Sequence, residues 1–87
     1  MSKFTVLGQE LWKLADDITA TSIKLKFLRD SLCNSASTLN YKISDTYSGN
    51  ETLQYIDQSI GSLENTIRAL DLAATSAVNY AYILESM

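Results

Sequence analysis

Apolar residues recur at alternating three- and four-residue steps through both halves of this chain, a spacing that places them on one face of a helix. The first row contains Phe4, Leu7, Leu11, Leu14, Ile18, Leu25, Leu28, Leu32, Leu39 and Ile43, and is interrupted only at Thr21 and at Ser35–Ala36. The second row contains Leu53, Ile56, Ile60, Leu63, Ile67, Leu70, Ala74, Ala77, Ala81 and Leu84. Proline, which breaks helices, does not occur in the sequence. The pattern therefore predicts two long amphipathic helices.

Small and polar residues separate the two apolar rows at positions 45–51. Gly49 can adopt a positive φ angle, and serine, asparagine and aspartate favour turns. Ser48 and Glu51 have the spacing of a capping box for the second helix, and Asn50 is an alternative cap. A connection this short makes the helices antiparallel. We therefore expect an all-α fold, an antiparallel two-helix hairpin forming one domain over residues 1–87. Its helices should cover about 3–45 and about 51–86, joined by a turn at about 46–50.

Composition excludes several classes of protein. With 46% hydrophobic and 20% charged residues, the chain is too apolar for a disordered tail. The 7 basic and 10 acidic residues give a net charge of −3, so we expect no nucleic-acid ligand. Without a run of about 18 apolar residues, no membrane span is expected. The N-terminus also lacks the apolar segment of a signal peptide.

The residue types needed for chemistry are scarce. Histidine, the commonest general base and metal ligand, does not occur. The single cysteine, Cys33, cannot form an internal disulfide, and a small half-buried thiol is its expected role. Asp16 and Asp17 are adjacent, so on a helix their carboxylates point about 100° apart. We therefore expect no enzyme activity, no catalytic or metal site and no cofactor.

A second group of large apolar side chains lies away from the main row of each helix. Antiparallel pairing places this group toward the end of the hairpin that is far from the turn. It consists of Trp12, Ile23, Phe27, Leu72, Tyr80 and Ile83. An isolated hairpin would leave these side chains in water, and exposed apolar patches mark interaction sites, although single surface aromatics are also normal. We interpret the group as a partner interface, through which a homodimer or heterodimer completes a four-helix bundle.

The turn carries a resemblance to a known family. Tyr47-Ser48-Gly49 is similar to the Trp-x-Gly turn of the WXG superfamily of type VII secretion, whose members are small acidic helical hairpins, with tyrosine in place of tryptophan. With Asn50 included, the stretch also resembles the Ser-Gly-Asn turn of small partner proteins of LXG toxins in Gram-positive bacteria. The resemblance covers most of the chain.

The resemblance implies a secretion role. The chain would bind a helical partner, either itself, another small hairpin protein or the N-terminal helical domain of an LXG toxin, and would assist its targeting and export. It would be cytoplasmic before export, then secreted or associated with the cell envelope by a route that does not use a signal peptide.

The export signal of the family is an aromatic residue followed four positions later by an acid. Near the C-terminus, Tyr82 and Glu85 are three residues apart, so they form only a degenerate version of this signal. Tyr41 and Asp45 match the spacing but lie at the end of the first expected helix. We therefore expect a partner to supply or complete the signal.

Two alternatives to the secretion role remain open. One is a self-assembling structural subunit of a secretion apparatus, such as a type III needle protein, although the proline-containing turn of needle subunits is missing here. The other is a generic coiled-coil adaptor.

Overall fold

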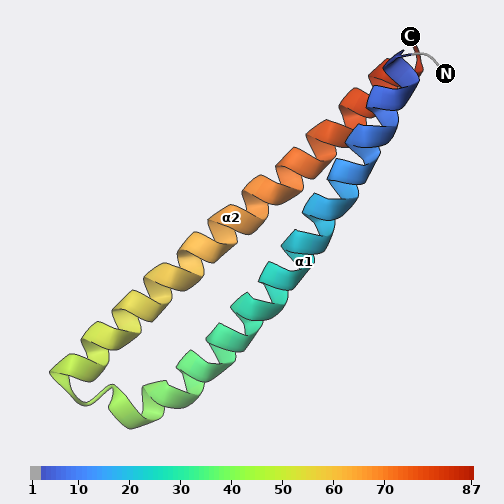
Figure 1. Ribbon diagram of the computed structural model, residues 1–87. Helices are drawn as coiled ribbons and strands as arrows, with labels where there is room; N and C mark the ends of the chain where they lie inside the picture. The colour runs from blue at the N-terminus through green and yellow to red at the C-terminus, as the bar shows by residue number, and fades with distance from the viewer. Residues whose placement is uncertain (1–2) are drawn as a thin grey trace. The chain divides into compact units, whose positions relative to one another are not determined.

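The computed structural model describes residues 3–87 as two long helices. Helix α1 covers Lys3–Ile43 and helix α2 covers Tyr47–Glu85, and they run antiparallel (Figure 1). The described residues contain no strand. The expected all-α helical hairpin is therefore confirmed at the level of its two helices. Residues 1 and 2, which the expected domain includes, lie outside the described part of the chain.

The connection between the helices differs from the expected turn. It comprises only residues 44–46, because α2 begins at Tyr47. Thr46 caps this helix: its Oγ1 accepts a hydrogen bond from the Gly49 N–H at 2.9 Å, and its carbonyl accepts the first helical bond, from the Asn50 N–H at 3.0 Å. The expected cap at Ser48 or Asn50 is therefore wrong.

The four turn-motif residues Tyr47, Ser48, Gly49 and Asn50 form the first turn of α2. We expected Gly49 to adopt a positive φ angle, but no described glycine has one. Glycine is required at this position for a different reason. A Cβ at Gly49 would collide with the Ile43 carbonyl oxygen and lie 2.6 Å from the Thr46 Oγ1. Glycine therefore permits the close approach of the α1 end to the α2 start.

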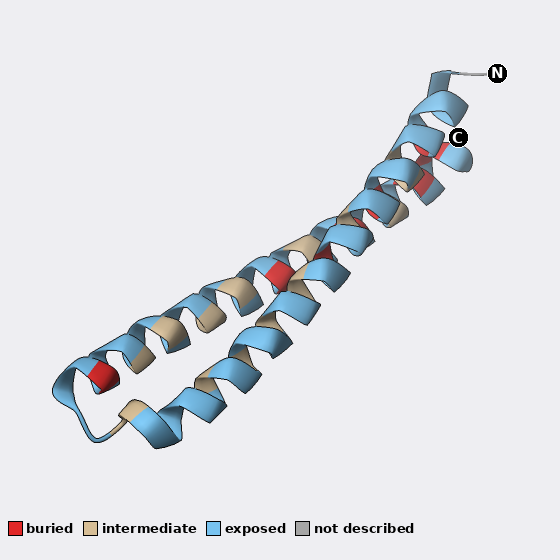
Figure 2. Cartoon of the chain, turned by 60° about the horizontal axis from the view of Figure 1, so that its bottom comes forward, coloured by how far each residue is buried: buried red, intermediate tan, exposed pale blue. Residues whose placement is uncertain are grey.

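The chain divides into two compact units. We call residues 3–23 with Arg68–Met87 the terminal unit, and Lys24–Ile67 the turn unit. Each unit contains a segment of α1 beside a segment of α2. Every residue of the apolar row expected for α2 is buried or half-buried, which confirms that prediction (Figure 2).

The inner row of α1 is different from the one expected. The buried residues of α1 are Gly8, Ala15 and Ser22, all in the terminal unit. Along the whole of α1, five of the leucines assigned to the core are exposed. The exposed leucines are Leu7, Leu14, Leu28, Leu32 and Leu39. For Leu7 and Leu14, which directly precede Gly8 and Ala15, the reason is steric, because the small residues let α1 approach α2 closely whereas the leucines would hold the two helices apart. The leucines are therefore left on a neighbouring face of α1.

Candidate partner-binding surfaces

The six residues expected to form a partner interface differ in exposure and are divided between the two units. Five are exposed, most of all Phe27 at 72% and Leu72 at 67%. Ile23, Leu72, Tyr80 and Ile83 belong to the terminal unit, and Phe27 belongs to the turn unit. Only the sixth, Trp12, is half-buried. The exposed five therefore remain available to a partner, whereas Trp12 is engaged within the chain.

Trp12 packs against the C-terminal end of α2. Its ring meets the Tyr82 ring edge to face, with centroids 5.2 Å apart and planes at 85°. Its indole N–H donates a hydrogen bond to the Glu85 Oε1 at 2.8 Å. The two residues of the degenerate export signal, Tyr82 and Glu85, are thus held together by one side chain of α1. The surface around Tyr82 and Glu85 therefore includes a side chain from each of the two helices.

Exposed leucines of α1 line a groove in the terminal unit. Its lining comprises Leu7, Glu10, Leu11 and Leu14 of α1 and Tyr80 of α2. Tyr80, one of the interface candidates, thus lines a groove together with other apolar side chains. The leucines beside it were predicted to lie in the core. In the structure two of them, Leu7 and Leu14, are exposed. This groove is apolar and open to a partner.

A second apolar groove lies in the turn unit. It is lined by Leu32 of α1 and by residues of α2, namely Thr52, Tyr55, Ile56 and Ser59. Tyr55 is 61% exposed and Leu32 is 40% exposed. Both grooves therefore combine exposed leucine from α1 with exposed tyrosine from α2, and tyrosine is enriched at protein interfaces.

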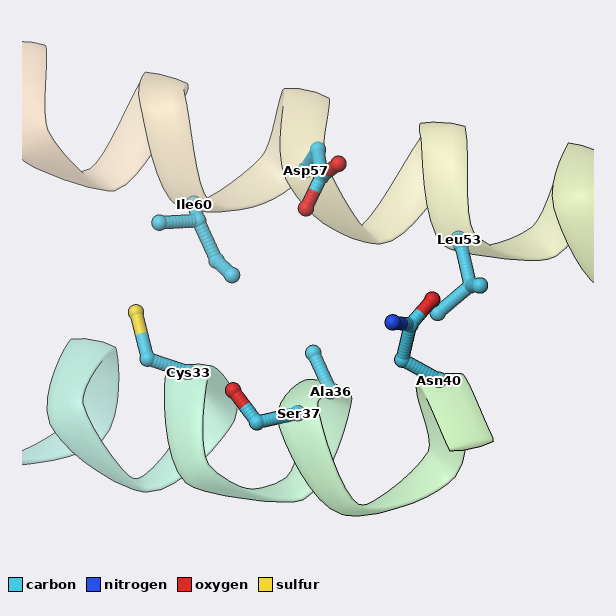
Figure 3. Close-up of a pocket in the computed structure, with 7 residues that line it drawn as sticks. All are labelled: Cys33, Ala36, Ser37, Asn40, Leu53, Asp57 and Ile60. Carbon is cyan, nitrogen blue, oxygen red and sulfur yellow. The ribbon is translucent and has the colours of Figure 1, made fainter. Parts of the chain in front are cut away.

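A third groove separates the helices of the turn unit and has a mixed character. It encloses about 390 Å³, and Figure 3 shows its side chains pointing from both helices into the space between them. Its lining comprises Cys33, Ala36, Ser37, Asn40, Leu53, Asp57 and Ile60. Cys33 is a free, half-buried thiol, as expected. The helices of this unit therefore do not close on each other completely.

One buried polar contact joins the helices of the terminal unit. Ser22 is 1% exposed, and its hydroxyl donates a hydrogen bond to the Asp71 Oδ1 at 2.7 Å. The bond satisfies a hydroxyl that would otherwise be costly to bury. Because it joins one position of α1 to one position of α2, it helps to define the register of the pairing.

The hydrophobic core is small for a chain of this composition. Within residues 3–87, the buried apolar side chains are Ala15, Ile67, Ala74, Ala81 and Leu84, three of them alanine. The chain exposes 6360 Å². A compact chain of 9.6 kDa exposes about 5,100 Å². The additional exposed area, about 1,300 Å², exceeds the roughly 800 Å² that each partner buries in a standard interface.

Sequence reasoning missed the leucine-lined grooves because it placed every leucine of α1 in the core. A signal for them exists in the sequence of α2. Positions that follow the helical spacing from Thr52 to Ile83 carry no charge, namely Thr52, Tyr55, Ser59, Ser62, Thr66, Ala69, Ala73, Ser76, Tyr80 and Ile83. All ten are exposed. An exposed helix face without charge indicates a contact surface.

Residues 3–87 contain no cluster of three or more histidine, cysteine or acidic side chains placed to hold a metal ion. Neither α1 nor α2 has a stretch apolar and long enough to span a membrane. Comparison of the chain with protein-family models, curated proteins and solved structures finds no match.

Proposed function

We propose that this chain is a WXG-like helical-hairpin protein that binds a helical partner and assists its export by a type VII route. The observation that carries the proposal is the imbalance between exposed and buried apolar side chains. Large residues such as Phe27 and Leu72 are exposed, while the buried core consists mostly of alanine. A helical partner would cover these residues and complete the core. The role is one of binding, without catalysis or a cofactor.

The start of α2 supports the resemblance to the WXG superfamily. The aromatic-x-Gly motif, Tyr47-Ser48-Gly49, lies beside the connection between the helices. Gly49 cannot be replaced there without a collision with the Ile43 carbonyl. A glycine at this position of a short helical connection therefore has a steric purpose. Tyr47 is exposed, so its ring is available to a partner.

The C-terminal end of α2 supports dependence on a partner for export. A receptor that read the Glu85 carboxylate would compete with the Trp12 indole, which already donates a hydrogen bond to it. Tyr82 is likewise in contact with Trp12. We therefore expect the partner to supply or complete the export signal, and the chain expressed alone to remain in the cytoplasm.

A secretion assay tests this function. It would use a host with an intact type VII apparatus and, as candidate partners, any helical proteins encoded beside this chain. Deleting the gene for this chain should reduce release of the partner into the culture supernatant, and returning the gene should restore that release. Efficient release of the partner without the chain, or of the chain without any partner, would contradict the proposal.

A binding assay addresses the interface residues. Phe27→Glu should weaken capture of the helical partner by about tenfold or more, because a charge would enter an apolar contact. Phe27→Leu is the matched control, since it keeps an apolar side chain of similar reach, and it should bind as the parent does. Equal binding by both variants would remove Phe27 from the interface.

A further inference from the structure

We propose that Trp12, Tyr82 and Glu85 form a binding site for a guanidinium group, the side chain of an arginine that a partner protein presents. We call these three residues the aromatic–acid cluster, and all of them belong to the terminal unit. The inference rests on the proposed binding function, since it names one chemical group of the partner. The cluster shares no residue with the three grooves described above.

The two aromatic rings of the cluster supply a surface for a cation. The ring centroids of Trp12 and Tyr82 are 5.2 Å apart and their planes meet at 85°, so the ring faces point in different directions. Tyr82 is 58% exposed, which leaves part of its ring open to solvent. The face of an aromatic ring carries negative potential and attracts a cation within about 6 Å of the centroid. A partner cation can therefore stack on this open ring.

The Glu85 carboxylate is held beside these rings. Tyr82 and Glu85 are three residues apart and share one face of α2. The Trp12 indole N–H donates to the Glu85 Oε1 at 2.8 Å, and a Cβ built at Gly8 would lie 3.5 Å from the Glu85 Cγ. A carboxylate can accept about four hydrogen bonds, so an arginine that stacks on the rings can reach it beside the indole without replacing the indole. The carboxylate is therefore positioned before a partner arrives.

The charges around the cluster favour a cation. Helix α2 ends at Glu85, and its last turn has no basic residue to offset the negative end of the helix dipole. On α1, Asp16 follows Trp12 by four residues, shares its face and is exposed. Lys13 lies about 100° from Trp12 around α1, and Lys3 lies about 13 Å from it along the helix axis. The cluster therefore has an excess of negative charge that a partner cation would neutralise.

Arginine fits this cluster better than lysine does. A guanidinium group is planar, so it can stack on a ring while its N–H groups point in its own plane toward a carboxylate beside that ring. A lysine ammonium is a compact and strongly hydrated charge without a flat face. An exposed carboxylate alone would bind either cation weakly. The combination of two rings with one carboxylate therefore selects the guanidinium group.

The test uses Trp12 as its reporter, because the chain contains one tryptophan. The full chain is titrated with N-acetyl-arginine amide, while tryptophan fluorescence and the NMR signal of the indole N–H are recorded. Binding should saturate with a Kd of about 10 mM, as expected for one stacked and ion-paired side chain. N-acetyl-citrulline amide has nearly the same shape without the charge, and N-acetyl-lysine amide has the charge without the flat group. Each should bind at least about fivefold more weakly.

Variants of the cluster locate the site. Glu85→Gln keeps an oxygen that accepts the indole bond but removes the charge, and it should weaken arginine binding by about fivefold. Glu64→Gln is the matched control, with the same change of charge at an exposed site of the turn unit, and it should bind as the parent does. Tyr82→Leu should weaken binding by about threefold, whereas Tyr82→Phe keeps the ring and should not. Circular dichroism should report equal helix content for all four.

Three results would overturn the proposal. They are a titration that does not saturate, binding of the citrulline or lysine compound as tight as that of arginine, and unchanged binding by both Glu85→Gln and Tyr82→Leu. If a variant loses helix content, the comparison of the three compounds on the parent chain still decides, since it requires no substitution.

Partner capture separates this inference from the proposed function. If the chain binds the arginine compound and captures no helical partner, the guanidinium site stands and the proposed function fails. If the chain captures the partner and does not bind the arginine compound, only the aromatic–acid cluster proposal fails. Glu85→Gln should also weaken partner capture by about fivefold relative to Glu64→Gln. Equal capture by these two variants would show that the partner presents no arginine to the cluster, and the proposal would fail.

Discussion

The terminal unit and the turn unit are built from the same two helices but are packed differently. In the terminal unit, the buried residues include Ala15 of α1 and Ala74 and Ala81 of α2. In the turn unit, α2 presents larger aliphatics such as Ile56 and Ile60, and these are only half-buried. Grooves remain on that unit. Small side chains let two helices approach and close, whereas large ones need a further helix to cover them.

The largest expected effect comes from overfilling the terminal unit. Ala81 is fully buried, so Ala81→Leu should lower the free energy of unfolding by about 3 kcal/mol, the upper part of the range for overpacking. The same change in the turn unit, Ala36→Leu, enters a groove of about 390 Å³ and should be neutral or stabilising by about 0.5 kcal/mol. Urea denaturation followed by circular dichroism, at one protein concentration, measures both. Equal losses would show that the two units are packed alike.

The next effect concerns the glycines of α2. Gly49→Ala should destabilise the chain by about 2 kcal/mol, because its Cβ would collide with the Ile43 backbone. Gly61→Ala meets no atom within 4 Å and should stabilise the chain by about 0.5–1 kcal/mol through helix propensity. Thermal unfolding of the two variants provides the comparison. A stable Gly49→Ala variant would remove the steric explanation of the aromatic-x-Gly motif.

A smaller effect should follow from the buried hydroxyl of the terminal unit. Ser22→Ala loses the hydrogen bond to Asp71 and should cost about 1 kcal/mol. Ser59→Ala, on the exposed side of the turn unit, loses only a bond to the Tyr55 carbonyl within its own helix and should change stability by less than about 0.5 kcal/mol. Chemical denaturation of both variants gives the difference. If Ser22→Ala were neutral, the bond would contribute nothing net to the pairing.

The smallest effect concerns the contact between Trp12 and the end of α2. Trp12→Phe keeps a ring beside Tyr82 but loses the donor to Glu85, so it should cost about 0.5–1 kcal/mol. Hydrogen exchange should become faster for backbone amides in the last turns of α2 and remain unchanged in the turn unit. Glu85→Gln retains an acceptor oxygen and serves as the control. Faster exchange throughout the chain would contradict a local role.

Much of the fold could be predicted from the sequence, and the errors have identifiable causes. The inner row of α2 was predictable because its apolar residues keep a regular spacing and its charges lie elsewhere. The cap at Thr46 was not predictable from the sequence, because Thr46, Ser48 and Asn50 lie close together and all three are suitable cap residues. The interface candidates were predicted as exposed, yet Trp12 is engaged by Glu85, a contact between residues at opposite ends of the sequence.

The sequence by itself determined that this chain forms two long helices with a short connection, because helical periodicity and the lack of proline are local properties. Only the tertiary structure decided which face of α1 lies against α2. The apolar face of α1 is wide enough to offer two adjacent rows, one with Leu14 and one with Ala15, and periodicity alone does not distinguish them. The choice depends on how closely α2 approaches, and there the smaller side chain fits while the leucine remains exposed.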